Sequence, residues 1–257
     1  MNYAWNIAAA GVITAMYRQD VAANNLANVE TAGFKGDCSF TMPRNAAHQE
    51  PGNANLPSNA LLDRLGGGVL LAPNRVDFTQ GQITPTDNPL DVAIQGSGFL
   101  TVESSTPGQI RLTRDGRMTI DSTGKLVTST TGQAVLDSSG QTISLNRQAP
   151  IAVDGDGNIR QNGQSVAKLA FTDVPDRRIL KKQGGGFYTV TAAAAKSNLA
   201  ATGQLVQNAV ERSSVDPIMA MTAMQNASSD LNASLRVMQV QTDMMKLAVN
   251  TFGRVSA

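Results

Sequence analysis

The sequence predicts a mainly β central domain inserted between N- and C-terminal α-helices that form a coiled-coil-like assembly segment. A long apolar heptad near the C-terminus, a thinner one near the N-terminus, and short alternating strands between them indicate this fold class. The expected boundaries are residues 1–34 for the N-terminal helix, 35–69 for an extended or loop segment, 70–191 for the β domain, 192–215 for a connector and 216–257 for the long C-terminal helix.

The N-terminal helix is expected from residue 2 to about residue 30. The stripe of heptad positions along one side of this helix, which we call its seam, advances by steps of four and three residues. It comprises Ala8, Val12, Ala15, Gln19, Ala22, Leu26 and Val29. Alanine permits two helices to approach closely but buries little apolar area, so this helix needs a partner to be stable. Gly33 is expected to adopt the left-handed conformation that ends a helix, with Phe34 packing back on the last turn.

The middle of the chain has no helical period. Prolines and the glycines Gly66–Gly68 punctuate residues 35–69, which are expected to wrap a neighbour or to be mobile. From Leu70 onward the apolar period falls to two, and Leu90–Gln95 is predicted to form a half-buried strand. Aspartate–glycine turns recur between the strands, as at Asp121 and Asp137, and together these features predict an antiparallel β domain.

The C-terminal helix is expected from Pro217 to Phe252, because Asp216 can cap its first turn and Gly253 follows its last. At about 1.5 Å per residue it would be roughly 54 Å long. Its seam runs in uninterrupted steps of three and four through Met221, Met224, Ser228, Leu231, Leu235, Met238, Thr242, Met245, Val249 and Phe252. Such a seam requires a long partner, either the N-terminal helix or the helices of neighbouring copies.

Composition excludes several classes of function. The 257 residues carry a net charge of +1 with only 16% charged side chains, so nothing indicates binding to nucleic acid or to anionic lipid. No run of eighteen apolar residues is present, so we expect no membrane insertion. No basic residue precedes Arg18 and no hydrophobic region precedes Ala8, so we expect no cleaved secretory signal. Without a cleaved signal two possibilities are left: the protein is cytoplasmic, or it is exported by a route that needs no such signal.

The side chains needed for catalysis or metal binding are scarce. Cys38 and His48 are the only cysteine and the only histidine, which excludes an intramolecular disulfide, a thiolate cluster and an imidazole ligand set. Asp154–Asn158 resembles the opening of a calcium loop, but Ile159 and Ser165 stand where that loop requires glycine and glutamate. We therefore expect no catalytic residue, no cofactor and no metal, and the protein is not expected to be an enzyme.

Three stretches of the chain carry a family resemblance. They are Asn24–Lys35, Phe78–Phe99 with its continuation Thr113–Gly116, and Gly203–Val215. Together they resemble the bacterial flagellar rod and hook proteins. The residues that carry the first two motifs are Asn24, Asn25, Leu26, Ala27, Asn28, Thr31, Gly33, Phe34, Lys35, Gly81, Asn88, Leu90, Asp91, Gly96, Gly98 and Phe99.

Length and the compact β domain resemble the basal-body rod subgroup of that family, the distal-rod (FlgG) and proximal-rod (FlgF) proteins. Two departures concern the C-terminal motif. Ser228–Asn232 replaces the family's usual Gln-Arg-Ala-Tyr-Glu run, and Ser214 replaces its usual asparagine. Both changes leave the heptad unbroken.

The resemblance implies a structural subunit of the flagellar basal-body rod that polymerises into the axial drive shaft, which transmits torque for motility. It implies type III export without a cleaved signal, a location in the periplasm-spanning rod, and packing of the terminal helices against neighbouring copies. The implied partners are further copies in a helical filament, other rod and hook proteins, and the export apparatus. Two alternatives are a hook-like or other axial component, and a secreted β-domain binding module with a helical oligomerisation stalk.

Overall fold

The computed structural model describes residues 3–45, 67–104, 109–190 and 199–252. A helix stands at each end of the chain and the region between them is rich in β-strands, so the predicted fold class is confirmed. The chain divides into two compact units. Unit 1 contains the described residues of Met1–Ala27, Asp37–Val76 and Pro217–Ala257, and unit 2 contains those of Asn28–Gly36 and Asp77–Asp216.

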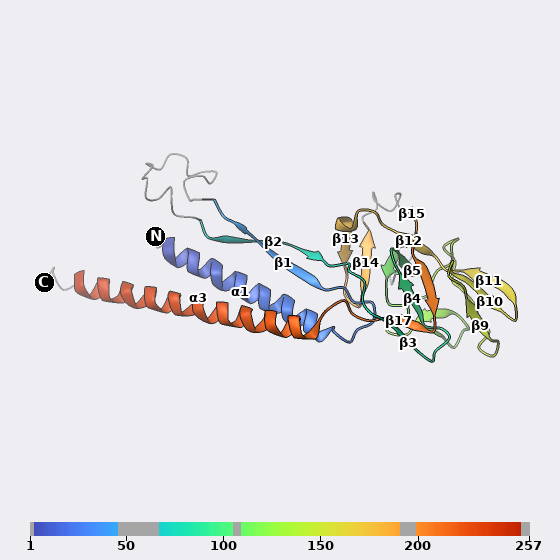
Figure 1. Cartoon of the computed structure of the whole chain (residues 1–257). Coiled ribbons are helices and arrows are strands. Elements are labelled where there is room, and N and C mark those ends of the chain that lie inside the picture. The colour runs from blue at the N-terminus through green and yellow to red at the C-terminus, as the bar shows by residue number, and fades with distance from the viewer. Residues whose placement is uncertain (1–2, 46–66, 105–108, 191–198, 253–257) are drawn as a thin grey trace. The chain divides into compact units, whose positions relative to one another are not determined.

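Unit 1 is an antiparallel pair of helices with a two-stranded ribbon. Helix α1 (Tyr3–Ala27) and helix α3 (Pro217–Phe252) lie side by side (Figure 1). Their direction follows from two contacts, because Gly11 approaches Ser234 while Arg18 reaches back to Asp230. Strands β1 (Asp37–Pro43) and β2 (Val69–Val76) pair antiparallel, and both contact α1.

Small side chains line the contact between the helices. Ala8, Ala15 and Ala22 of α1 are buried, as are Ala220 and Ala227 of α3. Because these side chains are short, the two backbones approach closely, and most of the larger apolar side chains of α3 are left partly or fully exposed.

Both helix predictions are confirmed, and the bounds of α3 agree with the sequence signals. Helix α1 ends three residues earlier than expected, because the backbone N–H of Thr31 bonds the carbonyl of Asn28 in a turn. Gly33 then takes the predicted left-handed conformation, with φ of 65°.

Within the segment expected as extended or loop structure at 35–69, Asp37–Pro43 forms the strand β1. The sequence does not reveal it, because the alternation of Cys38, Phe40 and Met42 with polar residues is short and lies in a polar stretch that contains proline and glycine. The expectations that concern Pro51, Pro57 and His48 fall on residues outside the described part of the chain.

Unit 2 consists of short strands, all paired antiparallel where pairing is described. Their bounds are β3 Ile83–Pro85, β4 Val92–Gln95, β5 Phe99–Glu103, β6 Ile110–Thr113, β7 Met118–Ile120, β8 Leu126–Thr128, β9 Ile151–Val153, β10 Asn158–Gln161, β11 Gln164–Lys168, β12 Phe171–Asp173, β13 Leu180–Lys182, β14 Phe187–Val190, β15 Leu199–Ala200, β16 Gln204–Gln207 and β17 Ala209–Glu211.

The described sheets are small apart from one of six strands, ordered β13-β14-β6-β5-β12-β15. A second sheet has the order β11-β10-β9, and three further pairs are β16-β4, β17-β3 and β7-β8. Strands β16 and β17 lie in the stretch expected as a connector. They return the chain to β4 and β3 before α3 begins, so the entry to α3 is held within unit 2.

One apolar cluster forms the core of unit 2 and contains Val92, Ile94, Leu100, Val102, Met118, Ile120, Leu126, Val135, Ile143, Leu145, Ile159, Leu169, Phe187 and Leu205. Strand β4 is expected from the sequence to be half-buried. Its Ala93 is instead fully buried along with Val92 and Ile94, because β4 is covered on both faces. The predicted aspartate turns are confirmed, since Asp121, Asp137 and Asp154 each accept hydrogen bonds from the backbone of their own loop.

Candidate functional site

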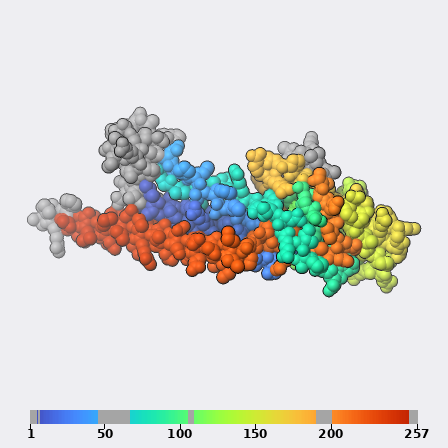
Figure 2. Space-filling view, in the orientation of Figure 1, coloured from blue at the N-terminus to red at the C-terminus, as the bar shows by residue number. Residues whose placement is uncertain are grey.

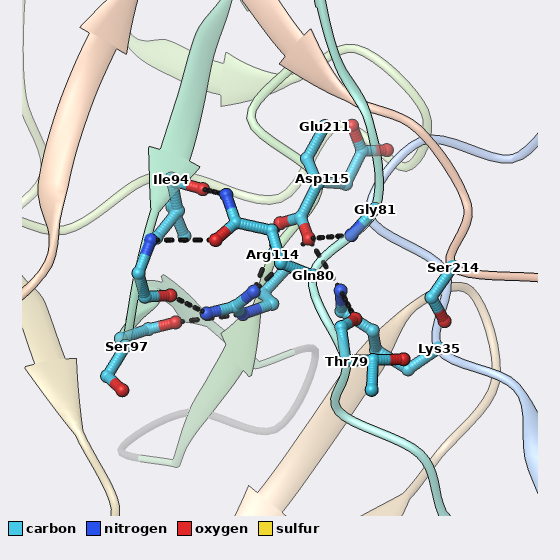
Figure 3. A network of polar contacts seen from close by, with 12 residues as sticks. Lys35, Thr79, Gln80, Gly81, Ile94, Ser97, Arg114, Asp115, Glu211 and Ser214 are labelled. Carbon is cyan, nitrogen blue, oxygen red and sulfur yellow. Dashed lines mark hydrogen bonds and ion pairs between the residues drawn. The ribbon is translucent and has the colours of Figure 1, made fainter.

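The most unusual feature of unit 2 is a fully buried carboxylate, that of Glu211 at the end of β17. The ammonium of Lys35 donates to its Oε1 at 2.5 Å, and the guanidinium of Arg114 donates to both its oxygens at 3.2 Å (Figure 3). The backbone N–H of Gly81 donates to the same Oε1 at 2.9 Å. All three charged side chains have almost no exposure, and we call them the ion cluster.

The backbone completes the coordination of the two cations. Lys35 also donates to the carbonyl of Thr79 at 2.6 Å. Arg114 donates through Nε to the carbonyl of Gly98 and through a terminal nitrogen to that of Gly96. The cluster holds two cations and one anion, so one positive charge is left after Glu211 is counted. The carbonyl dipoles offset this remaining charge.

An aromatic group and an amide support the same region. The guanidinium of Arg114 lies 5.4 Å from the centre of the Phe99 ring, which packs against Phe78 and Tyr188. Gln80 donates to the carbonyl of Ile94 and accepts from the N–H of Gly96, which fixes the loop before β3 against the end of β4.

The electrostatics of the cluster follow from its burial. Desolvation lowers the pKa of Lys35 and, separately, the pKa of Arg114. The charge of Glu211 opposes both shifts by raising each pKa. The three groups therefore depend on one another, and removal of the carboxylate would leave two buried cations without an anion.

The ion cluster joins two backbone segments that lead to the helices. The N–H of Gly33 donates to the carbonyl of Glu211 at 2.8 Å, and the N–H of Ser214 donates to the carbonyl of Phe34 at 3.1 Å. A Cβ at Gly33 would lie 2.4 Å from the carbonyl carbon of Arg114, so only glycine fits. The segment after α1 and the segment before α3 are thus paired within unit 2.

The chemistry available here is structural. Every charged group of the cluster has an internal partner, and none has the exposure that a substrate would need. Among the residues that the structure describes, no three His, Cys, Asp or Glu side chains gather as a metal ion would require. The arrangement can hold segments together but offers no reacting group.

The predicted seam residues divide between two environments. On α1, Ala8, Ala15 and Ala22 are buried in unit 1, while Val12 and Leu26 are half-buried there. Val29 lies beyond α1, in unit 2. On α3 the half-buried seam residues are Met224, Leu231 and Met238, and the exposed ones are Met221, Leu235, Met245 and Val249. The side chain of Phe252 lies outside the described part of the structure.

The motif residues hold turns and junctions. The amide of Asn25 bonds both the N–H and the carbonyl of Asp37, which joins the end of α1 to the start of β1. Thr31 bonds Asn28, and Asn88 bonds Asp91 at 2.7 Å ahead of β4. Of the other motif residues, Asn24 and Ala27 lie at exposed positions of α1, Gly81 and Gly96 lie in loops of unit 2, and Phe99 is buried at the start of β5.

Sequence reasoning does not find the ion cluster. Lys35 is recognisable only as a motif residue, and neither Arg114 nor Glu211 carries a local signal of a buried role. A usable signal does exist, because each of the three resembling stretches contributes one member of the cluster.

Comparison with known proteins decides the family. Residues 6–35 match the model of the flagella basal body rod protein, and residues 93–162 match that of the flagellar hook protein FlgE/F/G D1 domain. The chain is 30% identical to the flagellar basal-body rod protein FlgG of Buchnera aphidicola, with 82% of this chain and 84% of the relative covered. The chain belongs to the flagellar basal-body rod protein family.

Two further members of the rod family match over nearly their whole length. The FlgF protein of Caulobacter vibrioides is 28% identical, with 92% of both chains covered. The FlgG protein of the same organism is 27% identical, with 93% of this chain and 95% of the relative covered. The resemblance found in the motifs is therefore confirmed, and the ion cluster belongs to a rod-family chain.

Proposed function

We propose that this chain is a structural subunit of the flagellar basal-body rod that polymerises through its terminal helices into the axial drive shaft. Membership of the rod family supports the class of function. In this proposal unit 1 makes the contacts between copies, and the ion cluster of unit 2 fixes the segments that enter and leave the helices.

The proposal rests on one observation, which is that unit 1 exposes many large apolar side chains. Monomeric soluble proteins rarely display extended apolar surface. Among the described side chains of the two helices, the large apolar ones that are exposed are Trp5, Ile13, Met16, Ile218, Met219, Met221, Leu235, Val237, Val240, Met244, Met245, Leu247 and Val249. Assembly with neighbouring copies would remove this surface from water.

The proposal includes the route and the destination of the chain. Among the described residues no helix is both long enough and apolar enough to cross a bilayer. We propose export through the flagellar type III apparatus without a cleaved signal, incorporation into the periplasm-spanning rod, and contacts there with other rod and hook proteins. The proposed role involves no catalysis.

The test replaces one exposed seam residue with a charge. Leu235→Asp should prevent incorporation into basal bodies, because a neighbouring helix would have to bury the new carboxylate. Asn232→Asp is the matched control, since it adds the same charge at an exposed polar position one turn earlier and should assemble normally. The readouts are the chain's presence in purified basal bodies and cell motility. Complete rods that carry Leu235→Asp would refute the proposal.

A further inference from the structure

The segment that follows α1 is packed into unit 2 but belongs to none of the described sheets. We call residues 31–36 the strap, and all of them except the first are buried. The N–H of Gly33 donates to the carbonyl of Glu211 at 2.8 Å. The carbonyl of Phe34 accepts from the N–H of Ser214 at 3.1 Å. A few specific contacts therefore attach the strap to unit 2, rather than a strand ladder.

The apolar core of unit 2 is complete without the strap. The members of the core cluster lie between Val92 and Leu205 in the sequence, and none of them comes from the strap. Phe34 is the one large apolar side chain of the strap, and it lies outside that cluster. Segments with few contacts to an apolar core open locally at a lower free energy than the whole domain unfolds. The strap can therefore leave and rejoin a unit that stays folded.

A lysine from another part of unit 2 covers the strap. Lys182 is the last residue of β13, an edge strand of the six-stranded sheet. Its ammonium donates to the carbonyl of Lys35 at 2.8 Å and lies 3.9 Å from the centre of the Phe34 ring. Both contacts are favourable, because a cation is attracted to the face of an aromatic ring and a charged donor makes a strong hydrogen bond. Lys35 is thus held twice, through its side chain by the ion cluster and through its backbone by Lys182.

The segment that presents Lys182 is itself fixed at the surface. The short helix η2 (Arg177–Ile179) directly precedes β13, and both lie at the surface of unit 2, in amber in Figure 2. The guanidinium of Arg177 donates to the hydroxyl of Ser97 at 3.1 Å and lies 5.6 Å from the centre of the Phe78 ring. Because Arg177 anchors this segment, the ammonium of Lys182 is offered to the strap from a backbone that is held in place.

The preceding residue of the same strand has a different environment. Lys181 is exposed, and no described residue bonds its ammonium. Successive side chains of a strand point to opposite faces, so Lys181 points away from the face on which Lys182 meets the strap. The two lysines therefore carry the same charge but differ in their contact with the strap.

We propose that the strap closes on an already folded β-rich unit, and that Lys182 is the positioning residue that holds it closed. Lys182 acts through the Phe34 ring and the backbone of Lys35, and so keeps the side chain of Lys35 in the ion cluster. Because α1 leads directly into the strap, the end of α1 is anchored only while the strap is closed. This inference concerns the single chain and does not depend on the proposed assembly.

Hydrogen exchange of the full chain, followed by mass spectrometry, tests the role of Lys182. Lys182→Met keeps the apolar stem but removes the hydrogen bond and the charge over the ring. We expect the strap amides, including that of Gly33, and the amide of Ser214 to exchange about tenfold faster, because a hydrogen bond from a charged group contributes at least that much to the closed state. The amides of β4 and β5 should exchange as in the wild type.

Two further variants control for charge and for the side-chain stem. Lys181→Met removes the same charge from the adjacent position, and its strap amides should exchange as in the wild type. Lys182→Arg keeps a cation that can donate to a carbonyl and lie over an aromatic ring, so it should restore most of the protection. If only the stem mattered, Lys182→Met would be as well protected as the wild type.

The inference is overturned if the two methionine variants exchange alike. Faster exchange spread evenly over the strands of unit 2 would also overturn it, because the strap would then open only when the whole unit unfolds. Failure of Lys182→Met to fold, measured by circular dichroism, would mean that Lys182 supports the core rather than the strap. None of these results bears on the proposed function, which is tested by incorporation into basal bodies.

Discussion

At the scale of single residues, the chain relies on a few groups whose neighbours are distant in sequence. Lys35 and Glu211 are 176 positions apart, yet their side chains meet at 2.5 Å in a fully buried site. A buried ion pair of this kind adds little net stability compared with an apolar pair, but it penalises every arrangement in which one partner is missing. The ion cluster therefore specifies which segments come together.

Glu211→Ala should destabilise unit 2 by about 3 to 5 kcal/mol, because Lys35 and Arg114 would remain buried without their anion. Urea unfolding followed by circular dichroism measures the change. Glu30→Ala is the matched control, since Glu30 pairs with Arg212 at 2.7 Å at the surface and should cost less than about 1 kcal/mol. An equal loss of unfolding free energy in the two variants would show that the buried ion cluster contributes no more than the surface ion pair.

Gly33→Ala should destabilise unit 2 through two separate effects. Alanine is strained at φ of 65°, and its Cβ would collide with the carbonyl carbon of Arg114. Gly132→Ala isolates the first effect, because Gly132 has φ of 69° and no atom lies within 4 Å of the place that its Cβ would occupy. The difference between their unfolding midpoints reports the collision, and a difference near zero would contradict the close approach.

At the scale of helices and strands, the sequence reveals the features that are determined by residues adjacent in the chain. Both bounds of helix α3 are predictable, because Asp216, Pro217 and Gly253 are start and stop signals adjacent to it. Strand β1 is not predicted as a strand, since its apolar alternation is short and lies in a polar stretch that contains proline and glycine. The ion cluster escapes it as well, because a lysine, an arginine and a glutamate in separate segments each resemble ordinary surface charges.

The hairpin loops of unit 2 should make its stability depend on pH. Hydrogen bonds from the backbone of Gln141 and the hydroxyl of Ser139 lower the pKa of Asp137. The unfolded pKa is about 3.9, so the carboxylate stabilises the folded state above that pH and loses this effect as pH falls through the lower folded value. Acid should therefore weaken the folded state.

Asp137→Asn tests this loop directly. Its amide oxygen can still accept the hydrogen bonds, but it carries no charge to lose in acid. The variant should be slightly less stable than wild type at pH 7 and should lose less stability between pH 5 and pH 3. Urea midpoints measured across that range provide the comparison. A pH dependence identical to that of wild type would exclude a contribution from this carboxylate.

At the scale of the whole molecule, the two units are interleaved along the chain. Unit 1 takes its residues from both ends and from the ribbon, whereas Asn28–Gly36 follows α1 in sequence but folds with the β-strands. The pairing of Gly33 with Glu211 and of Phe34 with Ser214 accounts for this division. A boundary placed at the end of the N-terminal motif would therefore cut through the structure of unit 2.

Two truncations test whether residues 28–36 belong to the β-rich unit. A fragment of residues 28–216 retains the ion cluster, and we expect it to fold as a monomer because both helices are absent. A fragment of residues 37–216 lacks Lys35 and the backbone partners of Glu211 and Ser214, so we expect it to unfold at clearly lower urea concentration. Size-exclusion chromatography and urea unfolding provide the two measurements. If the two fragments were equally stable, residues 28–36 would belong with the helices instead. The ion cluster would then be dispensable for the fold of unit 2.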